Sequence, residues 1–443
     1  MFGFWFKKWS FNYKLGYAIV RTGLRTFYKK YELEGLENIP KDGGVIFAVN
    51  HQNAFMDPVV IASQLQQNTY YLTRADIFKK KLAAKIFNSI YMLPIYRQRD
   101  GVNTITKNEK TFDRCFDILK NNGFIIIFPE GNHNNQKKLR SLKKGVARIG
   151  LGSANKYNYK NKVYIVPVGL NYSNHTKMGA TLYMNFGAPI SLEKYYASHV
   201  NEPSATIKNV VDKVGKEMGE LILNIHSSNY DLINELVFIL KKKLNSLSKQ
   251  GYSLSNEFKL QQELVKKTEV LEKKDPATFN KLLGNVASLS SFLKENNISP
   301  IYLDDSLNKE TSIFINIIFL FLSSPIHLIG LLSNYLPYKI PVWFVNKKVK
   351  DVHFHSSIKM TLGVILFFLF WTTQLIIITN FFGIKIGVIY LISLPVLAWF
   401  NYKYWILILK TKGKWNYLNL KKKNKLVEAE KYYAEILSII EKL

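Results

Sequence analysis

Residues 45–57 read V-I-F-A-V-N-H-Q-N-A-F-M-D, five apolar residues followed at once by a polar segment with a histidine and an aspartate. The apolar run is short and rich in β-branched and aromatic residues, which predicts a buried strand over 45–49. His51 and Asp57 then lie just past the end of that strand. An imidazole accepts a proton near neutral pH, and a neighbouring carboxylate holds its tautomer. We therefore predict that His51 and Asp57 form a general-base pair.

Short apolar runs of this kind recur as far as about residue 190 and alternate with stretches of helical spacing. The further strand-like runs are 70–73, 91–96, 124–128, 163–171 and 182–187, and the helical stretches are 57–66, 76–90, 104–121 and 143–156. This alternation predicts an α/β domain over residues 41–225 with a largely buried sheet flanked by helices.

The chain outside this domain is predicted to be helical. Residues 1–40 are amphipathic, with aromatic residues and lysines near the start, which is typical of helices on a membrane surface; the alternative is a helix packed on its own domain. Residues 226–310 carry charges at helical spacing and predict a helical annex. Residues 411–443 predict a basic tail helix on the cytoplasmic side.

Three long apolar runs lie within residues 311–410. About 20 apolar residues cross a bilayer core as a helix, so the runs 361–379 and 386–402 predict a spanning hairpin. Lysines flank the hairpin on both sides, so we expect its two ends to lie on the cytoplasmic face together with the α/β domain that carries His51 and Asp57. The first run, 313–337, is then re-entrant or interfacial and broken at Pro325. The alternative is that all three runs are core helices of a large soluble domain.

The composition indicates an anionic partner. The formal net charge is +29 over 443 residues. Because the basic residues are spread along the chain, accompany apolar runs and form no recognisable nucleic-acid reader, we expect anionic membrane lipids as partners and no nucleic acid. Cys115 is the only cysteine, which excludes an intrachain disulfide and a cysteine-based metal site. We expect it to be a core thiol.

Other strand-like runs also deliver polar residues to their ends. Arg97 follows one of them, and its planar guanidinium suits a phosphate group. Glu130 and Gly131 follow another; the glutamate can orient a hydroxyl acceptor or hold an arginine, and the glycine permits a sharp turn. Val166-Pro167-Val168 marks a further apolar strand end.

In this order the segments resemble the motif blocks of the glycerophospholipid acyltransferase family, the PlsC-like enzymes that acylate glycerol-3-phosphate and lysophosphatidic acid. The resemblance covers roughly residues 30–195, and its most specific block is Phe128-Pro129-Glu130-Gly131. It implies a mixed sheet flanked by helices. Two departures stand out. Five residues instead of the usual four separate His51 from Asp57, so a tight turn must bring them together, and Asn132-His133 replaces the usual Thr-Arg.

The resemblance implies direct acyl transfer from acyl-CoA or acyl-carrier protein, with no cofactor, no metal and no covalent enzyme intermediate. His51 takes the proton of the acceptor hydroxyl while Asp57 holds the imidazole. The acceptor-phosphate side is assigned to Arg97, Glu130, Gly131, Arg74, Arg140 and Lys144, and the acyl side to Val166, Pro167 and Val168.

Several alternatives stay open at this point. The acceptor is glycerol-3-phosphate, dihydroxyacetone phosphate or lysophosphatidic acid, which share a phosphate. A transacylase that moves an acyl chain between phospholipids, or a catalytically silent basic membrane adaptor, would carry similar segments. A serine hydrolase is disfavoured because the sequence has no Gly-x-Ser-x-Gly elbow. His353 and His355 have a spacing that can bind metal, but no metal site is predicted there.

Overall fold

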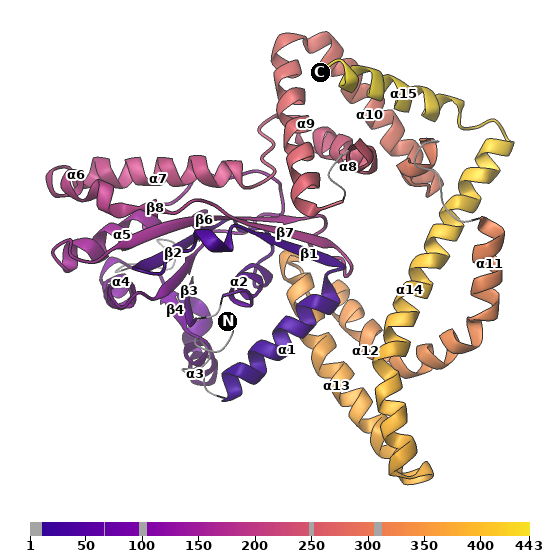
Figure 1. Ribbon diagram of the computed structural model, residues 1–443, viewed down its shortest axis with the longest axis horizontal. Coiled ribbons are helices and arrows are strands. Elements are labelled where there is room, and N and C mark those ends of the chain that lie inside the picture. Colours follow the sequence, from indigo (N-terminus) through magenta and orange to yellow (C-terminus); the bar gives the residue numbers. More distant parts are fainter. Residues whose placement is uncertain (1–10, 66, 97–103, 248–251, 305–311) are drawn as a thin grey trace. The chain divides into compact units, whose positions relative to one another are not determined.

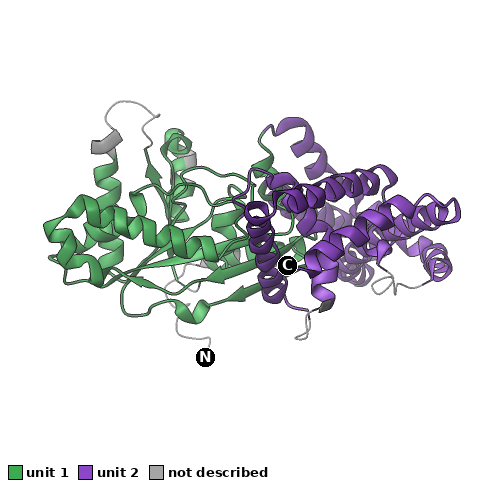
Figure 2. Cartoon of the chain, turned by 90° about the horizontal axis from the view of Figure 1, so that it is seen from above, with its two compact units in different colours: residues 1–224, 351–357 green, residues 225–350, 358–443 purple. Residues whose placement is uncertain are grey.

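The computed structural model describes residues 11–65, 67–96, 104–247, 252–304 and 312–443. The chain divides into two compact units, coloured separately in Figure 2. Unit 1 comprises residues up to 224 together with 351–357, and unit 2 comprises 225–350 and 358–443. The short segment 351–357 therefore belongs to unit 1, although the chain on either side of it belongs to unit 2.

Unit 1 is built on a mixed sheet, eight-stranded in the described residues, with the strand order β1-β7-β6-β2-β5-β3-β4 and β8 paired to β6 (Figure 1). The strands are β1 Lys30–Glu34, β2 Gly44–Val49, β3 Thr69–Arg74, β4 Met92–Ile95, β5 Phe124–Ile127, β6 Val163–Tyr172, β7 Thr181–Phe186 and β8 Ile190–Ser191. Strands β6, β2, β5, β3 and β4 run parallel to their neighbours in this order, whereas β7 and β8 pair with β6 in the antiparallel sense. The predicted mixed α/β fold is confirmed.

Strand β2 lies near the middle of this sheet, and all six of its residues are buried. A strand covered on both faces reads as a continuous apolar run, which explains why residues 45–49 do not alternate. The helices of unit 1 are α1 Phe11–Phe27, α2 Met56–Ala62, α3 Lys81–Ser89, α4 Thr104–Lys120, α5 Gly145–Lys156, α6 Tyr196–Asn201 and α7 Pro203–Glu220. Figure 1 shows α2 on the opposite side of the sheet from α5 and α7.

The main core lies between the sheet and the face formed by α4, α5 and α7. Ile46 and Ile165 from the strands pack there with Leu119 of α4, Ile149 of α5 and Val214 of α7, each at most 1% exposed. Burial of a large aliphatic side chain stabilises a fold by about 1.5–3 kcal/mol. This core fixes the central strands from which the polar residues at their ends project.

The expectation of helix throughout residues 1–40 is wrong at its C-terminal end. Helix α1 ends at Phe27, and Lys30–Glu34 forms β1, which pairs in parallel with β7. The segment alternates Lys30, Tyr31, Glu32, Leu33 and Glu34, a period of two that fits a strand and not a helix. The aromatic residues before position 11 lie outside the described part of the chain.

Unit 2 is helical. Its helices are α8 Tyr230–Leu247, α9 Leu254–Lys274, α10 Pro276–Asn296, α11 Ile313–Leu322, α12 Ser324–Lys348, α13 His355–Phe382, α14 Ile384–Lys422 and α15 Val427–Glu441. The first turn of α13 belongs to unit 1. Among the described residues, two helical segments are long and apolar enough to cross a membrane, Val352–Phe382 and Ile384–Lys422. They contain the predicted spans 361–379 and 386–402.

The apolar run 313–337 forms parts of two helices, α11 and α12, which are bent by 61° at a short break. The break falls at Ser323, two residues before Pro325. Pro325 lies in the first turn of α12, where a helix tolerates proline. The C-terminal boundary predicted at residue 411 differs from the structure. Helix α14 continues to Lys422, because residues 403–422 contain no proline and many strong helix formers.

Candidate active site

The polar residues singled out in the sequence follow strands that run parallel to one another. His51 comes two residues after β2 and Glu130 comes three residues after β5, while Arg74 is the last residue of β3. Strands β2, β5, β3 and β4 are adjacent and parallel, so their carboxyl ends meet at one edge of the sheet. Ligands of open α/β sheets commonly bind at this edge.

His51 and Asp57 are in direct contact. The distance between His51 Nδ1 and Asp57 Oδ2 is 2.9 Å. Since Nδ1 faces a carboxylate, it carries the proton and donates it to this hydrogen bond, which leaves the lone pair on Nε2. The His51 side chain is 16% exposed, whereas that of Asp57 is fully buried. The aromatic ring of Phe128 stacks on the imidazole with ring centres 4.1 Å apart. The imidazole is thus held from two sides and still reaches solvent.

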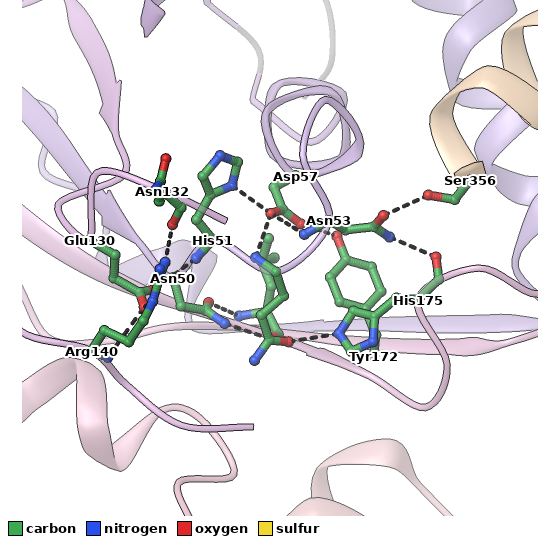
Figure 3. Close-up of polar contacts among 12 residues, drawn as sticks. Asn50, His51, Asn53, Asp57, Glu130, Asn132, Arg140, Tyr172, His175 and Ser356 are labelled. Carbon is green, nitrogen blue, oxygen red and sulfur yellow. Dashed lines mark hydrogen bonds and ion pairs between the residues drawn. The ribbon is translucent and has the colours of Figure 1, made fainter. Parts of the chain in front are cut away.

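The carboxylate of Asp57 is held by further donors, as Figure 3 shows. Its Oδ2 also accepts hydrogen bonds from the backbone N–H groups of Gln52 and Asn53, at 2.8 and 2.7 Å. Its Oδ1 accepts the hydroxyl of Tyr172, the last residue of β6, at 2.7 Å. Hydrogen bonds from several donors offset the loss of hydration that a buried carboxylate undergoes. Four hydrogen bonds therefore fix the Asp57 carboxylate in position beside His51.

A tight turn brings the two residues together despite the five residues between them. Ala54 adopts a left-handed backbone conformation with φ of 36°, and α2 begins immediately after the turn, so that Asp57 lies in its first helical turn. Before the turn, the Asn50 amide exchanges two hydrogen bonds with the backbone of Leu170 on β6, at 2.7 and 3.0 Å. These bonds fix the end of β2, and the carboxylate of Asp57 then closes the turn by capping the N–H groups within it.

Glu130 links two segments of the site. Its Oε1 accepts the backbone N–H of His51 at 2.9 Å, and its Oε2 accepts Nε–H of Arg140 at 2.9 Å. The glutamate side chain is 3% exposed and the arginine side chain 30%. Gly131 has φ of 76°, a left-handed conformation that favours glycine, and its N–H donates to the Phe128 carbonyl at 3.0 Å. The loop after β5 is therefore a closed turn anchored to the loop after β2.

The remaining predicted phosphate-side residues are placed differently. Arg97 lies outside the described residues, and β4 ends two positions before it at Ile95. Arg74 forms a two-pronged ion pair with Asp76, in which Nε donates to Oδ1 at 3.0 Å. Lys144 is exposed and immediately precedes α5. Arg140, in contrast, is linked to His51, because Glu130 accepts hydrogen bonds from both residues.

The predicted acyl-side residues form part of the sheet. Val166, Pro167 and Val168 lie on β6 and pair in parallel with residues 47–49 of β2. Val166 and Val168 are fully buried. Their assignment to the acyl side stays a prediction. Cys115 is also fully buried, and burial raises the pKa of its thiol to about 12, as expected for a core residue that is not a nucleophile.

Sequence reasoning missed several polar residues around Asp57. Tyr172 comes from β6. The Asn53 side chain bridges two distant segments, donating to the His175 carbonyl in the loop after β6 at 3.0 Å and accepting from Ser356 Oγ in the first turn of α13 at 2.6 Å. The imidazole of His175 donates from Nε2 to the Gln52 side chain at 3.1 Å. These residues are 115 to 303 positions from their partners, and no local spacing in the sequence links them.

Comparison with known proteins identifies this part of unit 1. Residues 30–171 match the model of the family described as Acyltransferase, and they include the whole His51–Asp57–Glu130 arrangement. This part of the chain is similar to an acyltransferase domain. Over 127 residues the chain is 30% identical to glycerol-3-phosphate O-acyltransferase 2 of Saccharomyces cerevisiae, a match that covers 28% of this chain and 17% of the yeast protein.

The chain is similar to two further proteins. Over 147 residues it is 28% identical to a chloroplastic 1-acyl-sn-glycerol-3-phosphate acyltransferase of Arabidopsis thaliana, covering 32% of this chain and 36% of that protein. The crystal structure of the 1-acyl-sn-glycerophosphate acyltransferase PlsC from Thermotoga maritima shares 20% identity and a TM-score of 0.33, covering 48% of this chain and 85% of that one. The chain spans well under two thirds of the length of each relative that it matches by sequence.

Proposed function

We propose that this protein transfers a fatty acyl group from a thioester to the hydroxyl of glycerol-3-phosphate or 1-acylglycerol-3-phosphate. The observation that supports it most directly is the 2.9 Å contact between His51 and a buried Asp57. The pair lies within the residues that match the acyltransferase model, and the names of the matched relatives supply the two acceptors.

In the proposed reaction, Nε2 of His51 accepts the proton of the acceptor hydroxyl as its oxygen attacks the thioester carbonyl carbon. A C–O bond forms, the C–S bond then breaks, and the imidazolium returns the proton to the departing thiolate. Asp57 stabilises the imidazolium in between. General-base catalysis contributes about 10²–10⁴-fold, and fixed orientation of the reactants accounts for much of the remaining acceleration.

The acceptor phosphate is proposed to bind at the same edge of the sheet. Arg97 follows β4, and Arg74, Arg140 and Lys144 add positive charge near the ends of β3 and β5. Glu130 would contribute by holding Arg140, with which it forms a 2.9 Å ion pair. A guanidinium held in this way presents its remaining N–H donors in a fixed orientation, as bidentate phosphate binding requires.

The proposed reaction takes place at a membrane. Two apolar helical segments, Val352–Phe382 and Ile384–Lys422, are long enough to span a bilayer. Lysines flank both, so we propose that the catalytic domain faces the cytoplasm and meets an anionic lipid surface. The donor is acyl-CoA or acyl-carrier protein, and the reaction needs no cofactor.

The proposal is tested with the full chain purified in detergent. Labelled palmitoyl-CoA, palmitoyl-carrier protein and labelled phospholipid are each offered with glycerol-3-phosphate, dihydroxyacetone phosphate or lysophosphatidic acid. We expect transfer from a thioester to a phosphate-bearing acceptor, and its loss in His51→Ala. The exposed His226→Ala is the matched control and should keep full activity.

Two outcomes would contradict the proposal. Transfer only from phospholipid, without any thioester, would indicate a transacylase. No transfer to any acceptor, under conditions in which a known acyltransferase in the same detergent is active, would favour a catalytically silent adaptor.

A further inference from the structure

A second polar cluster lies beside the proposed base. The segment 351–357 lies in unit 1, and its residue Asp351 contacts His133 in the loop that follows β5. Within this cluster His133 Nε2 lies 3.0 Å from Asp351 Oδ2, and His353 Nδ1 lies 2.7 Å from Asp351 Oδ1. The rings of His133 and His353 are 4.5 Å apart. Residues separated by 218 positions thus bring two imidazoles and a carboxylate to one point.

We propose that His133, Asp351 and His353 bind a divalent transition metal ion of the Zn²⁺ type. Each residue offers one ligand atom, and the three atoms lie within 4.8 Å of one another. In a tetrahedral zinc site with bonds of 2.0–2.2 Å, ligand atoms are about 3.4 Å apart. Movements of roughly 1 Å in two loops would therefore complete the site.

The other nitrogen of His353 supports this reading. Within the described residues, His353 Nε2 is buried and has no hydrogen-bond partner. Buried polar atoms in folded proteins are almost always paired, and an orphaned one calls for a ligand such as a bound ion. Because Nδ1 of His353 already contacts Asp351 Oδ1, a cation bound through Nε2 gives the His353 ring a second partner that the described residues do not supply.

The chemistry of the three groups selects the kind of ion. Imidazole favours zinc, copper, iron and nickel over magnesium or calcium, which prefer sites made entirely of oxygen ligands. Three protein ligands leave a coordination position for water or another oxygen ligand, unlike the four-ligand sites that serve structure alone. The ring of His133 lies edge-to-face with that of His51, 5.5 Å between centres. A bound dication would therefore lie close to the proposed base. Its binding can be measured without the transfer reaction.

The residues that converge differ from the pair that the sequence suggests. His353 and His355 form the H-x-H pair, but the structure joins His353 to Asp351 and His133 and leaves His355 out of the cluster. His355→Gln is therefore a matched control for His353→Gln. The two positions are two residues apart and carry the same side chain, yet only one belongs to the proposed site.

The experiment uses full-length protein without a histidine tag, treated with chelator and dialysed. Zn²⁺ alone is titrated in by calorimetry, and Co²⁺ alone is followed by its visible absorption, which reports low-coordinate ligation. We expect one equivalent to bind to the parent and to His355→Gln. His133→Gln and His353→Gln should each bind roughly 100-fold more weakly or not at all. Loss of a residue that only hydrogen-bonds to a metal ligand weakens binding about 10–100-fold, and loss of a ligand itself should cost at least as much.

Size-exclusion profiles and thermal unfolding without metal check that the variants are folded. Binding that is equal in the parent and in the His133→Gln, His353→Gln double variant would overturn the proposal. Loss of binding in His355→Gln with full binding in His133→Gln would assign the ion to the H-x-H pair and overturn it as well. Failure of acyl transfer would leave the metal titration unaffected, so the two proposals fail separately.

Discussion

The backbone N–H of His51 donates to Oε1 of Glu130 over 2.9 Å, so the loops after β2 and β5 are joined by a hydrogen bond between residues 79 positions apart. The side chain of Glu130 also holds Arg140, and the side chain of His51 contacts Asp57. One continuous set of hydrogen bonds therefore runs from the buried Asp57 to the partly exposed guanidinium of Arg140.

Asp57→Asn should reduce both activity and stability, whereas His51→Gln should reduce activity alone. The asparagine amide would place N–H groups against donors that now bind a carboxylate, which costs about 1–3 kcal/mol of unfolding free energy. His51 is partly exposed, so its replacement leaves the fold intact. We expect transfer to fall about 10²–10⁴-fold in both. Initial rates and thermal unfolding separate the two effects, and equal loss of stability in both variants would contradict this assignment.

Tyr172→Phe tests whether the hydrogen bond from Tyr172 to Asp57 supports the action of His51 as a base. It removes the 2.7 Å hydrogen bond to Asp57 Oδ1 and should lower the unfolding free energy by about 1 kcal/mol and the transfer rate several-fold. Tyr196→Phe is the matched control, because its hydroxyl donates to the Asn161 carbonyl at 2.8 Å in another part of unit 1. The control should lose similar stability and keep its rate. Equal rates in the two variants would show that Tyr172 has no bearing on transfer.

Arg140→Lys should raise the KM for the phosphate-bearing acceptor about tenfold with a smaller change in kcat. Lysine keeps the charge but lacks the planar fork that contacts Glu130 and the Asn132 carbonyl together. Arg148→Lys, the same change at an exposed position of α5, should leave the KM unchanged. Steady-state kinetics with varied acceptor provide the measurement. An unchanged KM in Arg140→Lys would remove Arg140 from the acceptor side.

His175 should make unit 1 less stable in mild acid. Burial lowers the pKa of this imidazole to about 4 from 6.5, with Lys137 and His353 contributing in the same direction and Asp57 opposing them. Between pH 6.5 and about 4 the unfolded chain binds a proton that the folded chain does not, so stability falls as pH falls through this window. The loss should reach about 3 kcal/mol. Thermal unfolding of His175→Gln between pH 7.5 and 4.5 should show a flatter profile than the parent, and identical profiles would contradict the assignment.

Much of the fold follows from local patterns. The run at 45–49 predicts β2 because a strand buried on both faces must be apolar throughout, and its neighbours β5 and β6 are also apolar along most of their length. One exception is β1, where the aromatic N-terminal context led to a helix being predicted across the alternating residues 30–34. Its strand conformation depends on pairing with β7, about 150 residues away, which no local pattern contains.

The candidate site was predictable only in part. His51, Asp57 and Glu130 could be selected because each follows an apolar run closely, and parallel strands bring their carboxyl ends to one edge. The contact between Arg140 and Glu130 could not be predicted in this way, because Arg140 does not directly follow a strand and reaches the site from a loop.

The sequence by itself determined the α/β class of unit 1, its central strands and the polar residues at their ends, because periodicity and burial are local properties of the chain. Only the tertiary structure decided which donors surround Asp57 and which imidazoles meet at Asp351. Those groups come from segments up to 303 residues apart, and their approach depends on how the core packs the sheet and its loops.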